Sequence, residues 1–342
     1  MRRTHYLVLR TIQELNRIKA PEADMTIFDR VDQTIGNTPL VRIDHATKDQ
    51  AEVLVKLEYQ NPGGSVKDRL ALGVIEAAEE SGDLKKGGLI VEATSGNTGI
   101  GLAMISAAKG YQLILTMPDT MSLERRRILQ AYGATLILTP GAQGMKGAIN
   151  KAREIAEEKG AFQTLQFDNP ANINIHYRTT GPEIGRDTEG KLDALVAGVG
   201  TGGTFGGTGK YLRENIEGIQ LVAVEPTGSP VLSGGGPGPH KIQGIGAGFV
   251  PSILDQGLID EVVKVELEDA VRTSRELAAK HGLLSGISAG ANTWAARQIA
   301  RQIAAKHGTG IGHRVVTIIP SNGERYLSTV LFEDLEEVAT VS

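Results

Sequence analysis

Short apolar strands alternate with helical segments through most of this sequence, and this alternation limits the fold more than any other feature. Strands are expected at residues 40–43, 53–58, 89–93, 112–117, 135–138, 194–197, 220–224 and 315–319. Helices are expected at residues 70–79, 100–109, 122–132, 146–159, 208–215, 270–281 and 289–307, and in part at 172–185. Largely apolar strands are typical of a parallel sheet that is buried on both faces. The pattern therefore predicts an α/β fold with mainly parallel sheets flanked by helices.

The length of the chain predicts two lobes. With 342 residues, it is long for a single hydrophobic core. We expect an N-terminal extension at 1–25, strands within 26–60 that join the larger domain, a smaller α/β domain at 61–165 and a larger one at 166–342. Each lobe would be a mainly parallel sheet flanked by helices, with the active site in the cleft between the lobes.

Composition excludes several classes of function. The sequence has no cysteine, which excludes disulfides, zinc–thiolate sites, iron–sulfur clusters and thiol catalysis and fits a reducing, cytoplasmic location. The net charge is -4 and the charges of both signs are interleaved, so no nucleic-acid partner is expected. The longest apolar runs are too short to span a bilayer, so no membrane association is expected. The 7 histidines show no metal-ligand spacing, so no metal is expected.

Residues 1–25 are mildly basic and lack the apolar region and cleavage site of a secretory signal. Three acidic residues and the absence of serine in this segment disfavour an organellar presequence. Four apolar side chains fall close to one helical face: Val8, Ile12, Leu15 and Ile18. A short helix that packs on the body or on a partner subunit is therefore the expected structure.

The segment NPGGSVKDR at residues 61–69 places a lysine at the start of a predicted helix. Its Pro-Gly-Gly sequence indicates a turn, Ser65 is the expected N-cap, and Asp68 would complete the capping arrangement. Lys67 would then lie in the first helical turn, where the helix dipole disfavours a cation. A lowered amine pKa suits a lysine that attacks a carbonyl, because only the neutral amine is nucleophilic.

A second strand-to-helix turn, GVGTGGT at residues 198–204, has the composition of an anion site. Glycines allow backbone N–H groups to close on an anion at a helix N-terminus, and the hydroxyls of Thr201 and Thr204 add donors. Phosphate is the natural occupant.

The same turn also satisfies the G-x-G-x-x-G pattern, and Glu225 ends the next strand, where a dinucleotide-binding acid could lie. A nicotinamide or flavin enzyme is therefore a competing interpretation at this point. A P-loop is not supported, because Thr204 stands where its first glycine is required and Tyr211 follows Lys210.

Two further turns have compositions that suit ligand binding. The segment TSGNT at 94–98 offers hydroxyls, an amide and backbone donors at a helix N-terminus, which suits a carboxylate such as that of an amino acid. The segment IPSNGERY at 319–326 follows the last strand, and strand ends line the ligand crevice of α/β sheets. A reactive lysine, a phosphate cradle and a carboxylate turn together are what a pyridoxal-phosphate enzyme acting on amino acids requires. A dinucleotide enzyme has no use for the lysine turn.

Four segments of the chain resemble the signature segments of the tryptophan-synthase-β-like, fold-type-II pyridoxal-phosphate enzymes: residues 61–69, 92–101, 198–204 and 320–329. Within that group the sequence is most similar to the cysteine synthases, or O-acetylserine sulfhydrylases. The resemblance runs from about residue 27 to about residue 332. It implies pyridoxal 5′-phosphate as cofactor and a ping-pong β-replacement that makes L-cysteine from O-acetyl-L-serine and sulfide through an aminoacrylate intermediate.

The resemblance also implies roles for individual residues. Lys67 would hold the cofactor and move the α-proton as the catalytic residue, Asn97 would bond its O3′ oxygen, and Ser321 would face its pyridine nitrogen. A serine there cannot keep the ring nitrogen protonated, which favours elimination of a β-leaving group. The cofactor phosphate would be bound by Gly200, Thr201, Gly202, Gly203 and Thr204. The substrate carboxylate would be bound by Thr94, Ser95, Gly96, Thr98 and Gln166, and the loop at 243–249, with Gly244, would cover the leaving-group side.

The resemblance implies a homodimer and, as an expected partner, serine acetyltransferase docked at the active site. An O-phosphoserine sulfhydrylase or a cystathionine β-synthase-type enzyme remains an alternative. The loop at 243–249 and the end of the chain shortly after the catalytic region, which leaves no regulatory module, disfavour the second; without cysteine, a cysteine-ligated haem is excluded. A catalytically inactive binding protein is also open, although the intact Lys67, Asn97 and Ser321 disfavour it.

Overall fold

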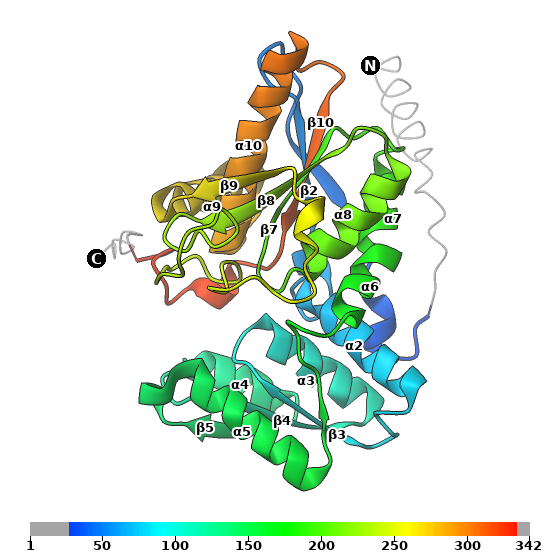
Figure 1. Cartoon of the computed structure of the whole chain (residues 1–342), viewed down its shortest axis with the longest axis vertical. Helices are drawn as coiled ribbons and strands as arrows, with labels where there is room; N and C mark the ends of the chain where they lie inside the picture. The colour runs from blue at the N-terminus through cyan, green and yellow to red at the C-terminus, as the bar shows by residue number, and fades with distance from the viewer. Residues whose placement is uncertain (1–26, 334–342) are drawn as a thin grey trace, which may run out of the picture.

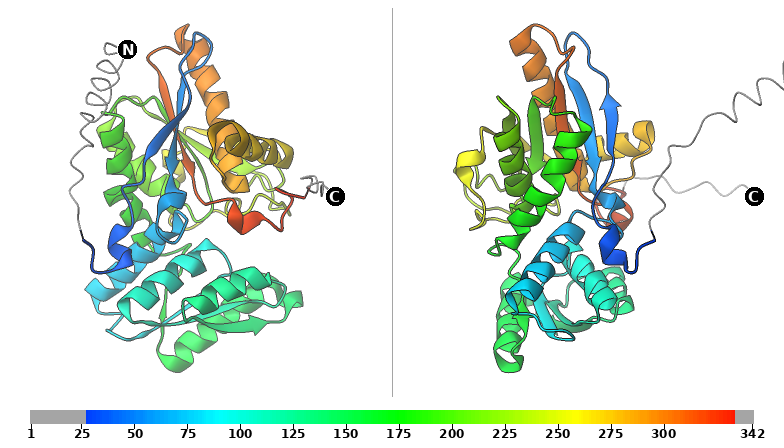
Figure 2. Two further views of the ribbon diagram at one scale, coloured as in Figure 1. Left: turned by 180° about the vertical axis from the view of Figure 1, so that it is seen from behind. Right: turned by 90° about the vertical axis from the view of Figure 1, so that its right-hand side faces the viewer.

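The computed structural model describes residues 27–333 and confirms the predicted α/β architecture. Two sheets flanked by helices form two lobes, one above the other in Figure 1, and Figure 2 shows the same arrangement from behind and from the side. The predicted N-terminal extension, residues 1–25, lies outside the described residues. The domain boundaries at residues 61 and 166 stay predictions.

The larger lobe is built on a six-stranded sheet with the order β1-β2-β10-β7-β8-β9. Its neighbouring strands are parallel except for β1 and β2, which form an antiparallel pair with Leu40 opposite Lys56. The strands are β1 (Leu40–Asp44), β2 (Glu52–Leu57), β7 (Ala194–Gly198), β8 (Gln220–Pro226), β9 (Glu261–Val265) and β10 (Arg314–Ile319).

Both faces of this sheet are buried, as the apolar strands predicted. In β7, Ala194 and Val196 belong to the core that packs on α9 (Leu267–His281) and α10 (Ile287–His307). The alternate residues Leu195 and Ala197 belong to the core on the other face, which packs on α7 (Thr180–Asp187) and α8 (Gly203–Asn215). Figure 1 shows these two pairs of helices on opposite sides of the sheet.

The smaller lobe is built on a four-stranded parallel sheet with the order β5-β4-β3-β6. One face packs on α2, α3 and α4, and the other packs on α5. The strands are β3 (Leu89–Ala93), β4 (Gln112–Pro118), β5 (Thr135–Thr139) and β6 (Phe162–Gln163). The helices are α2 (Lys67–Ser81), α3 (Asn97–Lys109), α4 (Leu123–Ala131) and α5 (Gly144–Lys159), followed by α6 (Ala171–Arg178), which packs on both α2 and α8.

Two strands were not predicted, and several helices begin earlier than their apolar spacing indicated. β6 has only two residues, and β9 is a partly exposed edge strand with a charged residue at each of two positions, so neither has a long apolar run. α3 and α8 begin at Asn97 and Gly203. Their first turns are polar or glycine-rich and lack apolar residues at helical spacing, so the sequence pattern did not reveal these turns.

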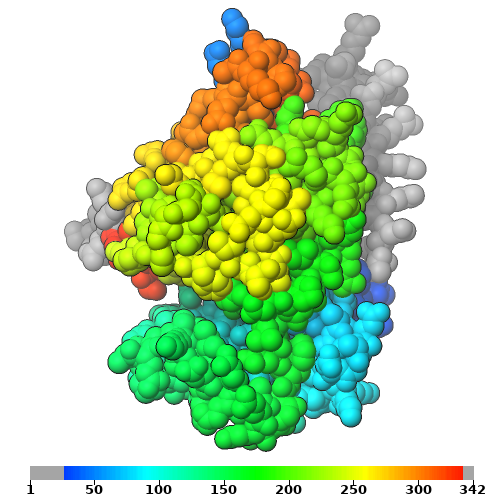
Figure 3. Space-filling model, in the orientation of Figure 1, coloured from blue at the N-terminus to red at the C-terminus, as the bar shows by residue number. Residues whose placement is uncertain are grey.

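The predicted loop at 229–248 is confirmed: between β8 and β9 the chain forms no helix or strand other than the short 3₁₀ turn Gln256–Leu258. Figure 3 shows the later part of this segment, in yellow, on one face of the larger lobe and next to the smaller lobe. Within residues 27–333, no helix is long and apolar enough to cross a membrane.

Candidate active site

A cavity of about 280 Å³ lies between the two lobes. Its walls include the turns that follow β3, β7 and β10, and the start of α2. In parallel sheets these carboxyl ends of the strands are where ligands bind. The cavity brings together ten of the predicted site residues: Lys67, Thr94, Gly96, Asn97, Thr98, Gln166, Gly200, Thr201, Gly244 and Ser321.

Lys67 is the first residue of α2, and its side chain reaches the cavity. Burial lowers the pKa of its amine to about 8. The prediction of a lowered pKa is therefore confirmed, but its cause is desolvation of the amine, whereas the prediction rested on the helix dipole. An amine in this state is neutral more often than a surface lysine and can accept a proton or attack a carbonyl.

The predicted capping of α2 is wrong in detail. The cap position is Val66, not Ser65, although the Ser65 Oγ accepts the N–H of Lys67 at 3.2 Å. Asp68 does not complete a capping box; its carboxylate accepts the N–H of Gly63 at 2.7 Å. The turn before the helix folds back so closely that a Cβ on Gly63 would lie 2.5 Å from Asp68 Oδ1. A side chain at this position would displace the Asp68 carboxylate from its hydrogen bond with the N–H of Gly63.

The glycine-rich turn after β7 forms a second cavity, of about 30 Å³, lined by Lys67, Gly200, Thr201, Gly202 and Thr204. It lies at the N-terminus of α8, where free backbone N–H groups and the helix dipole favour an anion. A Cβ on Gly200 would lie 2.3 Å from the carbonyl oxygen of Gly244, so a side chain there would displace the backbone that closes this space.

Neighbouring polar side chains hold the two threonine hydroxyls of this turn. Asn172 donates its Nδ2 to Thr201 Oγ1 at 3.0 Å, and the Thr204 Oγ1 lies 3.3 Å from His176 Nε2. Burial lowers the pKa of His176 to about 3, with a further contribution from the charge of Arg69, so this imidazole is neutral. Asn172 and His176 therefore make the surroundings of this turn polar without adding a charge.

The turn after β3 lines the larger cavity from the smaller lobe. Thr98 donates its hydroxyl to Gln166 Oε1 at 2.7 Å, which joins the helix start to the segment after β6. Gly96 donates its N–H to Thr94 Oγ1 at 3.2 Å. The Ser95 side chain, in contrast, lies 2.8 Å from the sulfur of Met121 and does not line the cavity.

A buried carboxylate that sequence reasoning did not assign supports this region. Glu92, at the end of β3, accepts the N–H of Ala93 at 2.8 Å and the hydroxyl of Thr164. Burial raises the pKa of Glu92, although these hydrogen bonds and those from the backbone of Leu165 and Gln166 lower it. Glu92 thereby holds the segment that carries Gln166, whose neighbour Leu165 has a φ of 50°.

The turn after β10 also lines the larger cavity, through Pro320, Ser321 and Tyr326. Ser321 is buried, and its Oγ lies 2.8 Å from the hydroxyl of Tyr326. An isolated bridge pairs Ser321 with Ser65, so this turn is tied directly to the lysine turn. Asn97, at the start of α3, donates its Nδ2 to the same Tyr326 hydroxyl at 3.4 Å.

Glu225, the acidic residue of the dinucleotide interpretation, is engaged elsewhere. Its carboxylate accepts the N–H of Leu232 at 2.8 Å and both the N–H and hydroxyl of Ser233, at 3.0 and 2.6 Å. It is buried and fixes the start of the loop after β8, so its oxygens are used within the fold. Glu225 is therefore not available to bind a ribose, as the dinucleotide interpretation requires.

Gly203, a predicted phosphate-binding residue, lines neither cavity. It opens α8 against Asn172, and a Cβ on Gly203 would lie 1.9 Å from Asn172 Oδ1. Sequence reasoning assigned no role to four other residues that line the larger cavity: Arg125, Phe167, Ser288 and Tyr326. Tyr326 lies in the segment after the last strand, and this position could have identified it as a site residue. Arg125 and Ser288 lie on α4 and α10, and only the packing of these helices decides which of their side chains reach the cavity.

Comparisons with known proteins agree with this geometry. A family model of pyridoxal-phosphate dependent enzymes matches residues 31–321. A cysteine synthase of Staphylococcus aureus is 56% identical over 306 residues, which cover 89% of this chain and 97% of the relative. The crystal structure of a cysteine synthase from Entamoeba histolytica has a TM-score of 0.87 at 42% identity and covers 94% of this chain and 96% of its own.

The crystal structure of an O-ureido-L-serine synthase is also similar, with a TM-score of 0.86 at 46% identity, covering 92% of this chain and 98% of its own. Both solved structures share the two-lobed arrangement over nearly their whole length. The chain therefore belongs to the pyridoxal-phosphate-dependent enzymes and, within them, to the cysteine synthases.

Proposed function

We propose that this protein makes L-cysteine from O-acetyl-L-serine and sulfide by a pyridoxal-phosphate-dependent β-replacement, with Lys67 as its catalytic residue. The observation that carries the proposal is a partly buried amine with a pKa of about 8 between an anion cradle and a carboxylate-type turn. The family membership of the chain agrees with it.

The residues around the cavity fit pyridoxal phosphate. The small cavity at the start of α8 has the donors a phosphate needs: backbone N–H groups and the hydroxyls of Thr201 and Thr204. Gly200 and Gly202, which line this cavity, let the backbone approach the phosphate. When bound, the cofactor supplies an electron sink that makes the α-proton of an amino acid acidic and lets a β-substituent leave.

Lys67 would hold the cofactor covalently and then work as general base. Its amine, made more often neutral by burial, would take the proton from the α-carbon and later return it there. Asn97 would donate to the ring oxygen, and Ser321 would face the ring nitrogen. Because a serine hydroxyl is a very weak acid, it would leave that nitrogen unprotonated.

The turn after β3 would bind the substrate carboxylate. The hydroxyls of Thr94 and Thr98, the backbone of Ser95 and Gly96, and the amide of Gln166 offer neutral donors at the positive end of α3. Gly244, from the loop at 243–249, would cover the leaving-group side.

The small number of cations in the larger cavity favours a donor whose β-substituent is an uncharged ester, such as O-acetylserine, over one that carries a phosphate. Among the described residues that line it, the cationic side chains are Lys67 and Arg125. The Arg125 Nη2 donates to Gln243 Oε1 at 2.6 Å, so its guanidinium already has a partner at the mouth. Acetate as leaving group needs no further cation, whereas a phosphate group would call for a bidentate guanidinium.

The proposal is tested by the visible absorbance of the purified, cofactor-loaded protein together with cysteine formation. O-acetylserine without sulfide should change the cofactor band, and added sulfide should restore it as cysteine appears. A band that ignores O-acetylserine but responds to O-phosphoserine would contradict the proposed donor. No band after incubation with pyridoxal phosphate would contradict the whole proposal.

Replacing Gln166 by alanine should raise the KM for O-acetylserine about 5- to 10-fold and leave the affinity for pyridoxal phosphate within about 2-fold, because one neutral hydrogen bond to the carboxylate is lost. Steady-state kinetics and equilibrium dialysis with the cofactor measure the two quantities. Gln302→Ala, on the exposed end of α10, is the control and should change neither. A loss confined to cofactor affinity would move Gln166 to the cofactor site.

The assembly and location of the protein are also part of the proposal. A homodimer is supported by exposed apolar side chains such as Ile128 and Leu327, which line one groove on the described surface. Sedimentation equilibrium should give twice the mass of the 36.3 kDa chain, and a monomer at micromolar concentration would contradict this. Binding of serine acetyltransferase and a cytoplasmic location stay predictions.

A further inference from the structure

Two neighbouring residues of the turn after β10 contact the two residues that would hold the cofactor ring. The Arg325 Nη1 donates to Asn97 Oδ1 at 2.5 Å, and its Nη2 donates to the carbonyl oxygen of Gly63. The Tyr326 hydroxyl lies 2.8 Å from Ser321 Oγ and accepts Asn97 Nδ2 at 3.4 Å. Neither Arg325 nor Tyr326 has a role in the function proposed above.

The contact with Arg325 decides which way the Asn97 amide points. A guanidinium carries only donors, so the Asn97 atom that faces it must be the carbonyl oxygen. The NH₂ group of Asn97 must then point the other way, toward the cavity and Tyr326. An amide in this orientation can donate to an oxygen of the cofactor, whereas the flipped amide could only accept.

The same reasoning continues to Ser321. A tyrosine hydroxyl has one hydrogen and two lone pairs. When Tyr326 accepts from Asn97, its own hydrogen is free to go to Ser321 Oγ, which lies at the distance of a good O–H···O bond. The Ser321 hydrogen is then left to point into the cavity, where it can be donated to an unprotonated ring nitrogen.

Resting on the proposed function, we infer that Arg325 and Tyr326 are positioning residues that orient Asn97 and Ser321 as hydrogen-bond donors toward the cofactor ring. The chain of donors runs from Arg325 through Asn97 and Tyr326 to Ser321. Hydrogen bonds in a buried series polarise one another, which would strengthen the bond from Ser321 to the cofactor ring.

Packing holds this chain of residues in place. Tyr326 is 3% exposed and Ser321 is 1% exposed. A Cβ on Gly286 would lie 2.5 Å from the Tyr326 ring and 2.9 Å from Ser321 Oγ, so the tyrosine occupies the space that this glycine leaves. The N–H of Gly286 also donates to the carbonyl oxygen of Ser321 at 3.1 Å. The hydroxyls therefore have little freedom to find other partners.

The test uses the protein loaded with pyridoxal phosphate that carries ¹⁵N in its ring, and reads the nitrogen chemical shift by NMR. The parent should show an unprotonated nitrogen that accepts a hydrogen bond. Tyr326→Phe keeps the aromatic ring and removes the hydroxyl, so the shift should move toward the value of free pyridine. Ser321→Ala should do the same, and the double variant should move no further than Ser321→Ala alone.

The Asn97 half of the chain is read by cofactor affinity. Arg325→Lys keeps the charge but loses the planar fork, so the affinity of the cofactor-free protein for pyridoxal phosphate should fall about 3- to 10-fold. Asn97→Ala should lower the affinity for pyridoxal phosphate by a smaller factor in the Arg325→Lys variant than in the parent protein. If Arg325→Lys does not fold, Arg325→Gln provides the same comparison.

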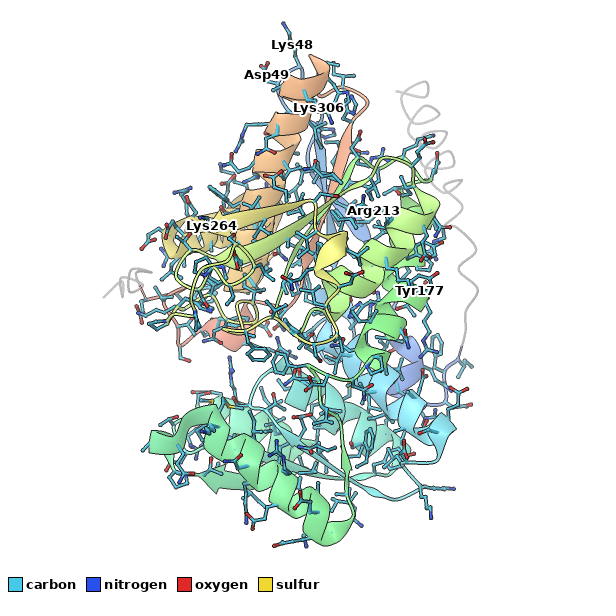
Figure 4. The ribbon with its side chains drawn as sticks, viewed as in Figure 1. Lys48, Asp49, Tyr177, Arg213, Lys264 and Lys306 are labelled. Carbon is cyan, nitrogen blue, oxygen red and sulfur yellow. The ribbon has the colours of Figure 1, made fainter. Side chains whose placement is uncertain are left out.

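Two control variants remove similar groups elsewhere in the larger lobe, and both residues are labelled in Figure 4. Tyr177→Phe removes a hydroxyl bonded to Glu214, and Arg213→Lys removes a guanidinium bonded to Asp260 and to the carbonyl oxygen of Leu258. Both should leave the nitrogen shift and the cofactor affinity unchanged.

An unchanged nitrogen shift in Tyr326→Phe, or additive effects of Tyr326→Phe and Ser321→Ala, would overturn the inference while the proposed function stands. A parent protein that binds no pyridoxal phosphate would instead overturn the proposed function. The two failures are therefore distinguishable.

Discussion

Replacing Lys67 by alanine should lower cysteine formation by about 10³-fold or more, because the variant loses both the covalent attachment of the cofactor and the base for the α-proton. Borohydride reduction of the loaded parent should add the mass of the cofactor to the chain, and the variant should show no such addition. Turnover assays and intact-mass spectrometry measure the two effects.

A matched control for this variant is Lys210→Ala. Lys210 also follows glycines, Gly206, Gly207 and Gly209, but it lies exposed on α8, with its Nζ 5.5 Å from the centre of the Tyr177 ring. Its replacement should leave both turnover and cofactor attachment unchanged. Lys67→Ala protein that kept even a tenth of the parent activity would contradict the role of Lys67.

Replacing Arg69 by leucine should lower the free energy of unfolding by about 3–5 kcal/mol, the range observed when one partner of a buried ion pair is removed. Arg69 is 1% exposed and lies between two carboxylates. Its guanidinium donates to Glu58 at 2.7 and 2.8 Å and to Glu183 at 2.7 Å through each of two nitrogens. Without Arg69, Glu183 would keep Lys56, 2.8 Å away, whereas Glu58 would lose its ion pair with Arg69.

Urea denaturation measures this effect, and Arg178→Leu is the control. Arg178 pairs with Glu76 on the surface, where both side chains are accessible, so its loss should cost less than about 1 kcal/mol. Equal costs for the two variants would show that the Arg69 cluster contributes no more than a surface pair. Since Arg69 joins α2 to α7 and to the segment after β2, the cluster connects the lysine helix to the larger lobe.

The pH dependence of stability should follow the same cluster. Burial alone would raise the pKa of Glu183, but the hydrogen bonds and charges of Arg69 and Lys56 outweigh it and lower the pKa to about 2. A carboxyl whose pKa is lower in the folded state stabilises the fold above its ordinary pKa of 4.5, and that contribution is lost as the pH falls toward 2. The parent should therefore lose more stability over this window than Arg69→Leu does.

Much of the fold and most of the site were predictable from the sequence, for local reasons. The short apolar strands and the periodic helices have strong sequence signals, and every predicted strand is present in the structure. The lysine turn, the glycine-rich turn and the turn after the last strand each follow a strand. In a parallel sheet the ends of such strands meet at one edge, so their convergence on Lys67 and Ser321 was predictable as well.

Other features depended on contacts between segments that are distant in sequence. Ser95 reads as a substrate donor, yet its side chain lies against Met121. Glu225 reads as a ribose ligand, yet the loop after β8 occupies its oxygens. In both cases the polar group bonds to a residue that is not its neighbour in the sequence. A local sequence pattern cannot predict such a partner.

The sequence by itself determined the order of the elements, the position of the reactive lysine and the chemistry of each turn, because these follow from residue type and spacing along the chain. Only the tertiary structure decided which hydrogen bonds those residues make. Arg325 and Asn97 are 228 positions apart, and their contact sets the direction of the Asn97 amide. Burial of the Lys67 amine likewise needs walls from both lobes, so its lowered pKa is a property of the folded molecule.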